Sequence, residues 1–113
     1  MVVQIRPSQL RQWFDSTGEA RPGVVLDVRE PGEWALASVE PDGFELLSIP
    51  MGVVPVRLTE LDRTRPIACL CHHGARSMQV ANFLHSQGFA QVANIAGGID
   101  AWATDLDPRV ARY

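Results

Sequence analysis

The segment Cys71-His72-His73-Gly74-Ala75-Arg76-Ser77 holds the residues best suited to chemistry. It lies between an apolar run that ends at Leu70 and a stretch with helical spacing, so it is expected to link a strand to a helix. Such a loop aims backbone N–H groups inward, and the start of the helix adds a positive partial charge, so an anion or a thiolate is stabilised there. Gly74 permits the backbone angles that a tight turn needs. The pattern predicts that Cys71 is a reactive nucleophile.

A thiolate at Cys71 can attack the outer sulfur of a thiosulfonate or persulfide donor. The product is a cysteine persulfide whose charged terminal sulfur is stabilised by the same N–H groups. Arg76 is expected to attract an anionic donor, and Ser77 to support the loop structurally. The remaining loop residues are expected to line the substrate site: His72, His73, Gly74 and Ala75. Either histidine orients a substrate or is simply solvated, and both interpretations stay open.

The second cysteine, Cys69, lies inside the apolar run and is expected to be a small buried side chain. A disulfide with Cys71 is disfavoured, because a reducing cytosol keeps thiols free and the two Cα atoms would lie near the upper limit of disulfide reach. Zinc is disfavoured because its ligands normally come from two separated clusters, whereas these cysteines and the adjacent histidines form one. We therefore expect no metal and no cofactor.

Asp27 interrupts a buried apolar run, so its carboxylate is expected to be hydrogen-bonded and to brace a neighbouring loop. Arg29 lies two residues further on. It is expected either to pair with Asp27 or to line the substrate pocket, and the sequence does not choose between the two.

Short apolar runs alternate with helical patterns along the chain. Strands are expected over residues 2–5, 24–28, 45–49, 67–71 and 91–95, and helices over 7–14, 30–37, 77–87 and 97–102. Residues 51–61 are ambiguous because Pro55 must lie in the first turn of any helix there. The chain after about residue 104 is expected to be irregular. This alternation predicts a parallel sheet, and ligands of such sheets bind beyond the carboxyl ends of the strands, where the segment after Leu70 lies.

The bulk properties restrict the function further. The 113 residues fit a single domain, covering 1–113, and the net charge of -3 gives no basic surface for nucleic acid. No apolar run is long enough for a membrane span. Polar residues within the first 14 positions break any signal-peptide core, so a cytoplasmic location is expected.

Several motifs together resemble the rhodanese-homology domain family. They are the loop 70–77, Val25-Leu26-Asp27-Val28-Arg29-Glu30-Pro31 with Glu33, Ser48-Ile49-Pro50-Met51-Gly52, Gly88-Phe89, and Ala96-Gly97-Gly98-Ile99-Asp100-Ala101-Trp102. The resemblance implies an α/β fold with a five-stranded parallel sheet flanked by helices on both faces, and sulfur transfer through a persulfide on Cys71. Residues 37–43 depart from the Gly-His-Ile-Pro-Gly that the family often has, which bears on donor or partner preference more than on the reaction.

Three functions remain open. The first is a sulfurtransferase that takes sulfur from a small-molecule donor such as thiosulfate or from a persulfide, and gives it to a thiol or to a sulfur-carrier protein. The second is a cysteine-dependent phosphatase or arsenate reductase, whose loop holds five residues between Cys and Arg where this chain has four. The third is a non-catalytic protein-binding module, although such modules typically lose the cysteine.

Overall fold

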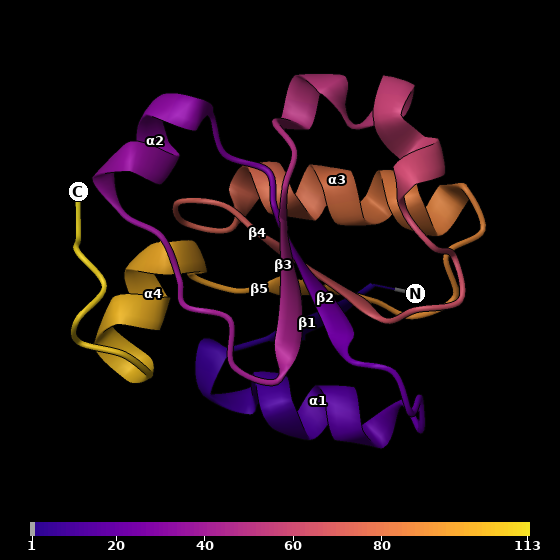
Figure 1. Cartoon of the computed structure of the whole chain (residues 1–113), viewed down its shortest axis with the longest axis horizontal. Helices are drawn as coiled ribbons and strands as arrows, with labels where there is room; N and C mark the ends of the chain where they lie inside the picture. Colours follow the sequence, from indigo (N-terminus) through magenta and orange to yellow (C-terminus); the bar gives the residue numbers. More distant parts are fainter. Residues whose placement is uncertain (1) are drawn as a thin grey trace.

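Five parallel strands form the central sheet of the computed structural model, which describes residues 2–113 (Figure 1). The strands are β1 (Val3–Ile5), β2 (Gly23–Asp27), β3 (Phe44–Ser48), β4 (Ile67–Leu70) and β5 (Val92–Ile95). The expected five-stranded parallel sheet is confirmed, and every strand boundary lies within one residue of its expected position.

The strand order β1-β5-β4-β2-β3 places β4 in the middle of the sheet. Every residue of β2, β4 and β5 is buried, because both faces of these strands are covered. The loop that follows β4 therefore leaves the sheet at the centre of its carboxyl edge, between the ends of its neighbours β5 and β2.

Helical segments cover both faces of the sheet, as expected. The α-helices are α1 (Leu10–Ser16), α2 (Pro31–Leu36), α3 (Ala75–Ser86) and α4 (Gly98–Asp105), and the 3-10 segments are η1 (Pro7–Gln9), η2 (Met51–Val53) and η3 (Pro55–Glu60). One buried cluster joins the sheet to α3 and the segments around η2 and η3, and includes Leu26, Cys69 and Leu84. A second cluster joins the opposite face to α1 and α4, and includes Leu70 and Trp102. In Figure 1, α2 lies near the same end of the sheet as the start of α3.

The largest local differences from expectation occur where proline shapes the chain. Residues 7–14 begin as a 3-10 turn at Pro7 and become α-helical only at Leu10. The ambiguous residues 51–61 form two short 3-10 segments, because Pro55 lacks a backbone donor and Arg57 departs from helical angles (φ -107, ψ 16). None of the helices formed by residues 2–113 has the length and apolar character that a bilayer-spanning helix requires.

Candidate active site

The thiol of Cys71 faces the loop that follows it. Its Sγ accepts a hydrogen bond from the backbone N–H of Gly74 at 3.1 Å and lies 3.2 Å from the Oγ of Ser77. Helix α3 begins at Ala75, so its positive N-terminal end lies beside the sulfur. The whole Cys71 residue is only 1% exposed, so the residues that surround the sulfur control which reagents can reach it.

Two carbonyl groups of the loop are held by α4. The N–H groups of Ile99 and Asp100, in the first turn of α4, donate to the carbonyls of Cys71 and His72 at 2.8 Å and 3.2 Å. Because a trans peptide directs its C=O and its N–H oppositely, the N–H groups that follow these two carbonyls point away from α4. Among the amides of the loop, the Gly74 N–H is the one that donates to the Sγ of Cys71.

This arrangement depends on two glycines. Gly98 (φ +60) lies so close to the loop that a Cβ there would collide with the carbonyl oxygens of Cys71 and His72. Gly74 adopts φ +109, and a Cβ on it would lie 3.2 Å from the backbone nitrogen of Gly97. The tight turn expected at Gly74 is therefore present, and it is packed directly against the turn that precedes α4.

A buried polar chain runs from the sulfur to the edge of the sheet. Asn94, in β5, is 2% exposed, and its Nδ2 donates to the carbonyl of Gly74 at 3.1 Å and to Oε1 of Gln4 at 3.0 Å. These two acceptors fix the amide so that its Oδ1 faces Ser77, whose hydroxyl donates to it. The Ser77 hydroxyl has a single proton. While that proton is donated to Asn94, the Ser77 oxygen faces the thiol as a hydrogen-bond acceptor. Ser77, which is expected to support the loop, is fully buried.

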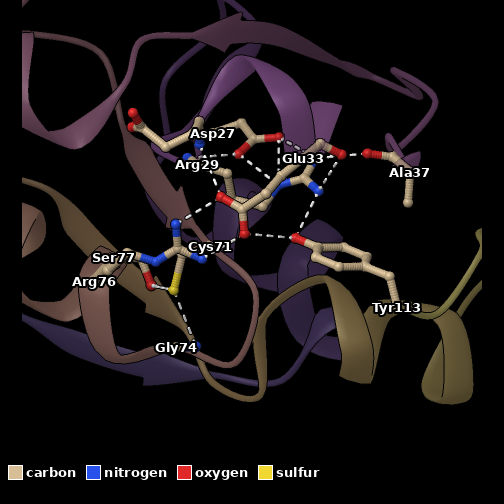
Figure 2. Close-up of polar contacts among 10 residues, drawn as sticks. Asp27, Arg29, Glu33, Ala37, Cys71, Gly74, Arg76, Ser77 and Tyr113 are labelled. Carbon is tan, nitrogen blue, oxygen red and sulfur yellow. Dashed lines mark hydrogen bonds and ion pairs between the residues drawn. The ribbon is translucent and has the colours of Figure 1, made fainter. Parts of the chain in front are cut away.

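Arg76 is paired with Glu33 across the gap between α3 and α2. Its Nη1 and Nη2 donate to the two carboxylate oxygens of Glu33 at 2.7 Å and 2.8 Å (Figure 2). Glu33 also accepts the N–H of Glu30 at the start of α2. The hydrogen bonds from Arg76, above all, lower the pKa of Glu33 from 4.5 to about 2. Arg76 was expected to hold an anionic donor; in this arrangement its charge is matched by Glu33.

Asp27 and Arg29 form a second, fully buried ion pair. The Arg29 side chain has no exposed surface, and its Nη2 lies 2.7 Å from Oδ2 of Asp27. Its guanidinium also donates to the carbonyl of Glu33 within α2, to the carbonyl of Ala37 just after α2 and to the hydroxyl of Tyr113, which ties the end of β2 to α2. Of the two expectations for Arg29, the structure shows the pairing with Asp27. The expected contact of Arg29 with substrate does not fit, because its guanidinium is enclosed by protein acceptors.

The two histidines lie on the outer side of the loop. The ring of His72 stacks on His73 (centroids 3.9 Å apart, 27° between planes) and on Tyr113 (3.9 Å, 9°). His73 and Ala75 are exposed, and His72 is partly covered. Cys69 is fully buried beneath the loop, and burial raises the pKa of its thiol, which suits an inert core side chain. Both cysteines are free.

The sequence assigns no role to three residues of the site. Glu33 lies in a motif shared with the family without a role of its own, and Asn94 carries a usable signal as a polar residue inside an apolar strand. Tyr113 offered no signal, because it lies 41 residues from its partner His72 in a segment without regular structure. Within residues 2–113, no three side chains of His, Cys, Asp or Glu gather where they would hold a metal ion.

Comparison with known proteins gives a consistent result. Residues 6–105 match the family model described as Rhodanese-like domain. A protein of Allochromatium vinosum named sulfurtransferase is 36% identical over 98% of this chain and 97% of its own length. Thiosulfate sulfurtransferase GlpE of Actinobacillus pleuropneumoniae is 30% identical over 88% of this chain and 85% of its own. The crystal structure of a rhodanese-related protein from Thermoplasma volcanium superposes with a TM-score of 0.77 at 27% identity, covering 98% of this chain and 99% of that one. Some relatives are longer, and the chain spans 30% of an Arabidopsis thaliana chloroplast protein named Rhodanese-like/PpiC domain-containing protein 12, at 42% identity over 79% of this chain.

The close approach of Gly98 to the loop predicts a large effect of Gly98→Ala. We expect this variant to lower the free energy of unfolding by about 2–4 kcal/mol, through positive-φ strain and collision with the loop carbonyls. Gly18→Ala is the matched control, since Gly18 has a similar φ of +73 but no atom within 4 Å of a built Cβ. Urea unfolding of both variants measures the difference. Equal losses would show that the contact with the loop contributes nothing.

The Arg76–Glu33 pair predicts a pH-dependent contribution to stability. A depressed folded-state pKa means that Glu33 stabilises the fold above its ordinary pKa of 4.5, and that this contribution is lost as the pH falls toward about 2. Glu33→Gln should therefore cost about 1–2 kcal/mol near neutral pH and progressively less below pH 4.5. Glu60→Gln, which breaks the exposed pair with Arg57, should cost less at neutral pH. Thermal unfolding across this pH range would contradict the account if the Glu33→Gln deficit stayed constant.

Proposed function

The chain belongs to the rhodanese-like domain family, and we propose that it is a sulfurtransferase that carries sulfane sulfur on Cys71. The relatives named sulfurtransferase support the general role. The observation that carries the specific proposal is the hydrogen bond from the Gly74 N–H to Cys71 Sγ, in a loop whose first two carbonyls are held by α4. Such a loop suits a nucleophile that carries negative charge before and after it accepts sulfur.

In the proposed reaction the Cys71 thiol first loses its proton to solvent. The thiolate then attacks the outer sulfur of the donor, a new S–S bond forms, and the old one breaks with its electron pair on the leaving group. The leaving group is sulfite from thiosulfate, or a thiolate from a persulfide. An acceptor thiolate or another sulfur-seeking nucleophile then attacks the terminal sulfur of Cys71–S–S⁻ and releases the Cys71 thiolate. The sulfur is transferred without an external oxidant or reductant.

Ser77 and Asn94 suit both charge states of the sulfur. With the hydroxyl donating to Asn94, the Ser77 oxygen can accept the S–H of the resting thiol. Rotation of the same hydroxyl presents its proton to the sulfur once that sulfur is charged. The Gly74 amide donates in both cases, since its N–H already points at Sγ.

The size of the loop favours sulfur over a larger oxyanion. Four residues separate Cys71 from Arg76, one fewer than in the phosphatase-type loops considered above. The shorter loop supports transfer of a single sulfur atom rather than phosphate or arsenate chemistry.

The donors we propose are thiosulfate or a small persulfide, and the acceptor is a thiol, free or on a sulfur-carrier protein. We also propose a cytoplasmic location, since both thiols are free and the nucleophile must stay reduced.

Formation of the persulfide gives the direct test of this function. After incubation with thiosulfate or glutathione persulfide, intact mass should increase by one sulfur atom, and cyanide or a thiol should remove it. Cys69→Ser is the matched control and should keep the adduct, whereas Cys71→Ser should lose it. An adduct on Cys71→Ser, or phosphate release from an aryl phosphate without any adduct, would refute the assignment.

Widening the loop tests whether its size determines the rate of sulfur transfer. Insertion of one glycine after Gly74 should slow sulfur transfer by about tenfold or more, because the amide donors move away from Sγ. Insertion of one glycine at Gly43, in an exposed turn, serves as the control and should leave the rate unchanged. Unchanged sulfur transfer after the first insertion would contradict the role given to the loop.

A further inference from the structure

Tyr113 connects the loop that carries Cys71 to helix α2. On the loop side its ring stacks on His72 with centroids 3.9 Å apart, and its carbonyl lies 2.9 Å from Nε2 of the same histidine. On the α2 side its hydroxyl donates to Glu33 Oε1 at 3.1 Å and accepts a hydrogen bond from Arg29 at 3.1 Å. Figure 2 shows the ring beside the group formed by Cys71, Arg76 and Glu33.

The path of the chain brings Tyr113 to this position. After α4 ends at Asp105, the last residues run toward α2 (Figure 1). Val110 is buried in the core, and Arg112 pairs with Asp100 in the first turn of α4 at 2.9 Å. These two attachments hold the segment at the edge of the site, so Tyr113 is placed by its neighbours as well as by its own contacts.

The contacts of Tyr113 narrow the access to the nucleophile. Cys71 is 1% exposed, and the loop on one side and the Arg76–Glu33 pair on the other are joined by the aromatic ring. A small reagent needs little space beside the ring. A cysteine persulfide on the surface of another protein brings its own backbone and neighbouring side chains, and it needs the ring to leave.

We infer that Tyr113 is a specificity-determining residue that favours small-molecule sulfur donors over persulfides carried by proteins. The inference rests on the proposed function, because it names the class of donor for the same site. Tyr113 acts by controlling access: Cys71 reacts with a bulky partner only during the fraction of time in which the ring has moved away.

The test compares two thiol reagents of different size, iodoacetamide and a polyethylene glycol maleimide. Peptide mapping separates modification of Cys71 from that of Cys69. If the ring is displaced about a tenth of the time, Tyr113→Ala should raise the rate with the large reagent about tenfold and change the rate with the small one much less. Tyr113→Phe keeps the stacking on His72 but loses the hydroxyl contacts, so its rate with the large reagent should lie between those of Tyr113→Ala and the wild type.

Leu106→Ala is the matched control, because Leu106 follows α4 in the same segment and is 49% exposed. Its ratio of large-reagent to small-reagent rates should equal that of the wild type. The inference is overturned if Tyr113→Ala leaves this ratio unchanged, or if Leu106→Ala raises it equally. Alkylation needs no sulfur donor, so a wild-type protein that forms no persulfide would refute the proposed function without altering the ratio.

The same variants then link access to sulfur transfer. Relative to the wild type, Tyr113→Ala should raise the rate of sulfur uptake from a protein persulfide by a larger factor than the rate from thiosulfate. An equal change with both donors would overturn the assignment of donor class.

Discussion

The outward direction of two carbonyl groups is the constraint on which this site depends. The first turn of α4 accepts no side chain at Gly98, and its next two N–H groups hold the carbonyls of Cys71 and His72. With the carbonyls held there, peptide geometry turns the N–H groups of His72 and His73 away from α4, and the Gly74 N–H donates to the sulfur. A single carbonyl turned inward would place negative partial charge beside a thiolate. The loop around Cys71 is thus shaped by a helix that is distant in sequence and adjacent in space.

Two ion pairs fix the position of α2 beside the loop that follows β4. Asp27 and Arg29 are buried together at the end of β2, and Arg29 reaches one carbonyl within α2 and one just after it. That attachment places Glu33 where it meets Arg76 from α3. Removing one member of the buried pair would leave the other charge uncompensated, so α2 and the loop after β4 are coupled through these four side chains. An incoming donor therefore meets the Arg76–Glu33 ion pair rather than an unpaired arginine.

The sequence predicted the strands and the position of the loop after β4 well, because those features are local. Apolar runs such as 67–71 identify buried strands, and a cysteine followed by Gly74 and Arg76 identifies the loop. The partners of these residues were harder to predict, since Arg29 and Arg76 each had several chemically reasonable contacts. Only the folded chain shows that Arg29 is enclosed and that Tyr113 lies against His72, because both depend on how distant segments meet. Asn94 is the exception, since a lone amide in an apolar strand already indicates a buried polar contact.

The most direct measurement of the central claim is a crystal structure of the wild-type protein after treatment with a sulfur donor. The account predicts an added sulfur on Cys71, lying within the loop and within hydrogen-bonding distance of the backbone nitrogens between His72 and Arg76. A persulfide whose outer sulfur points out of the loop, contacted by side chains alone, would contradict it.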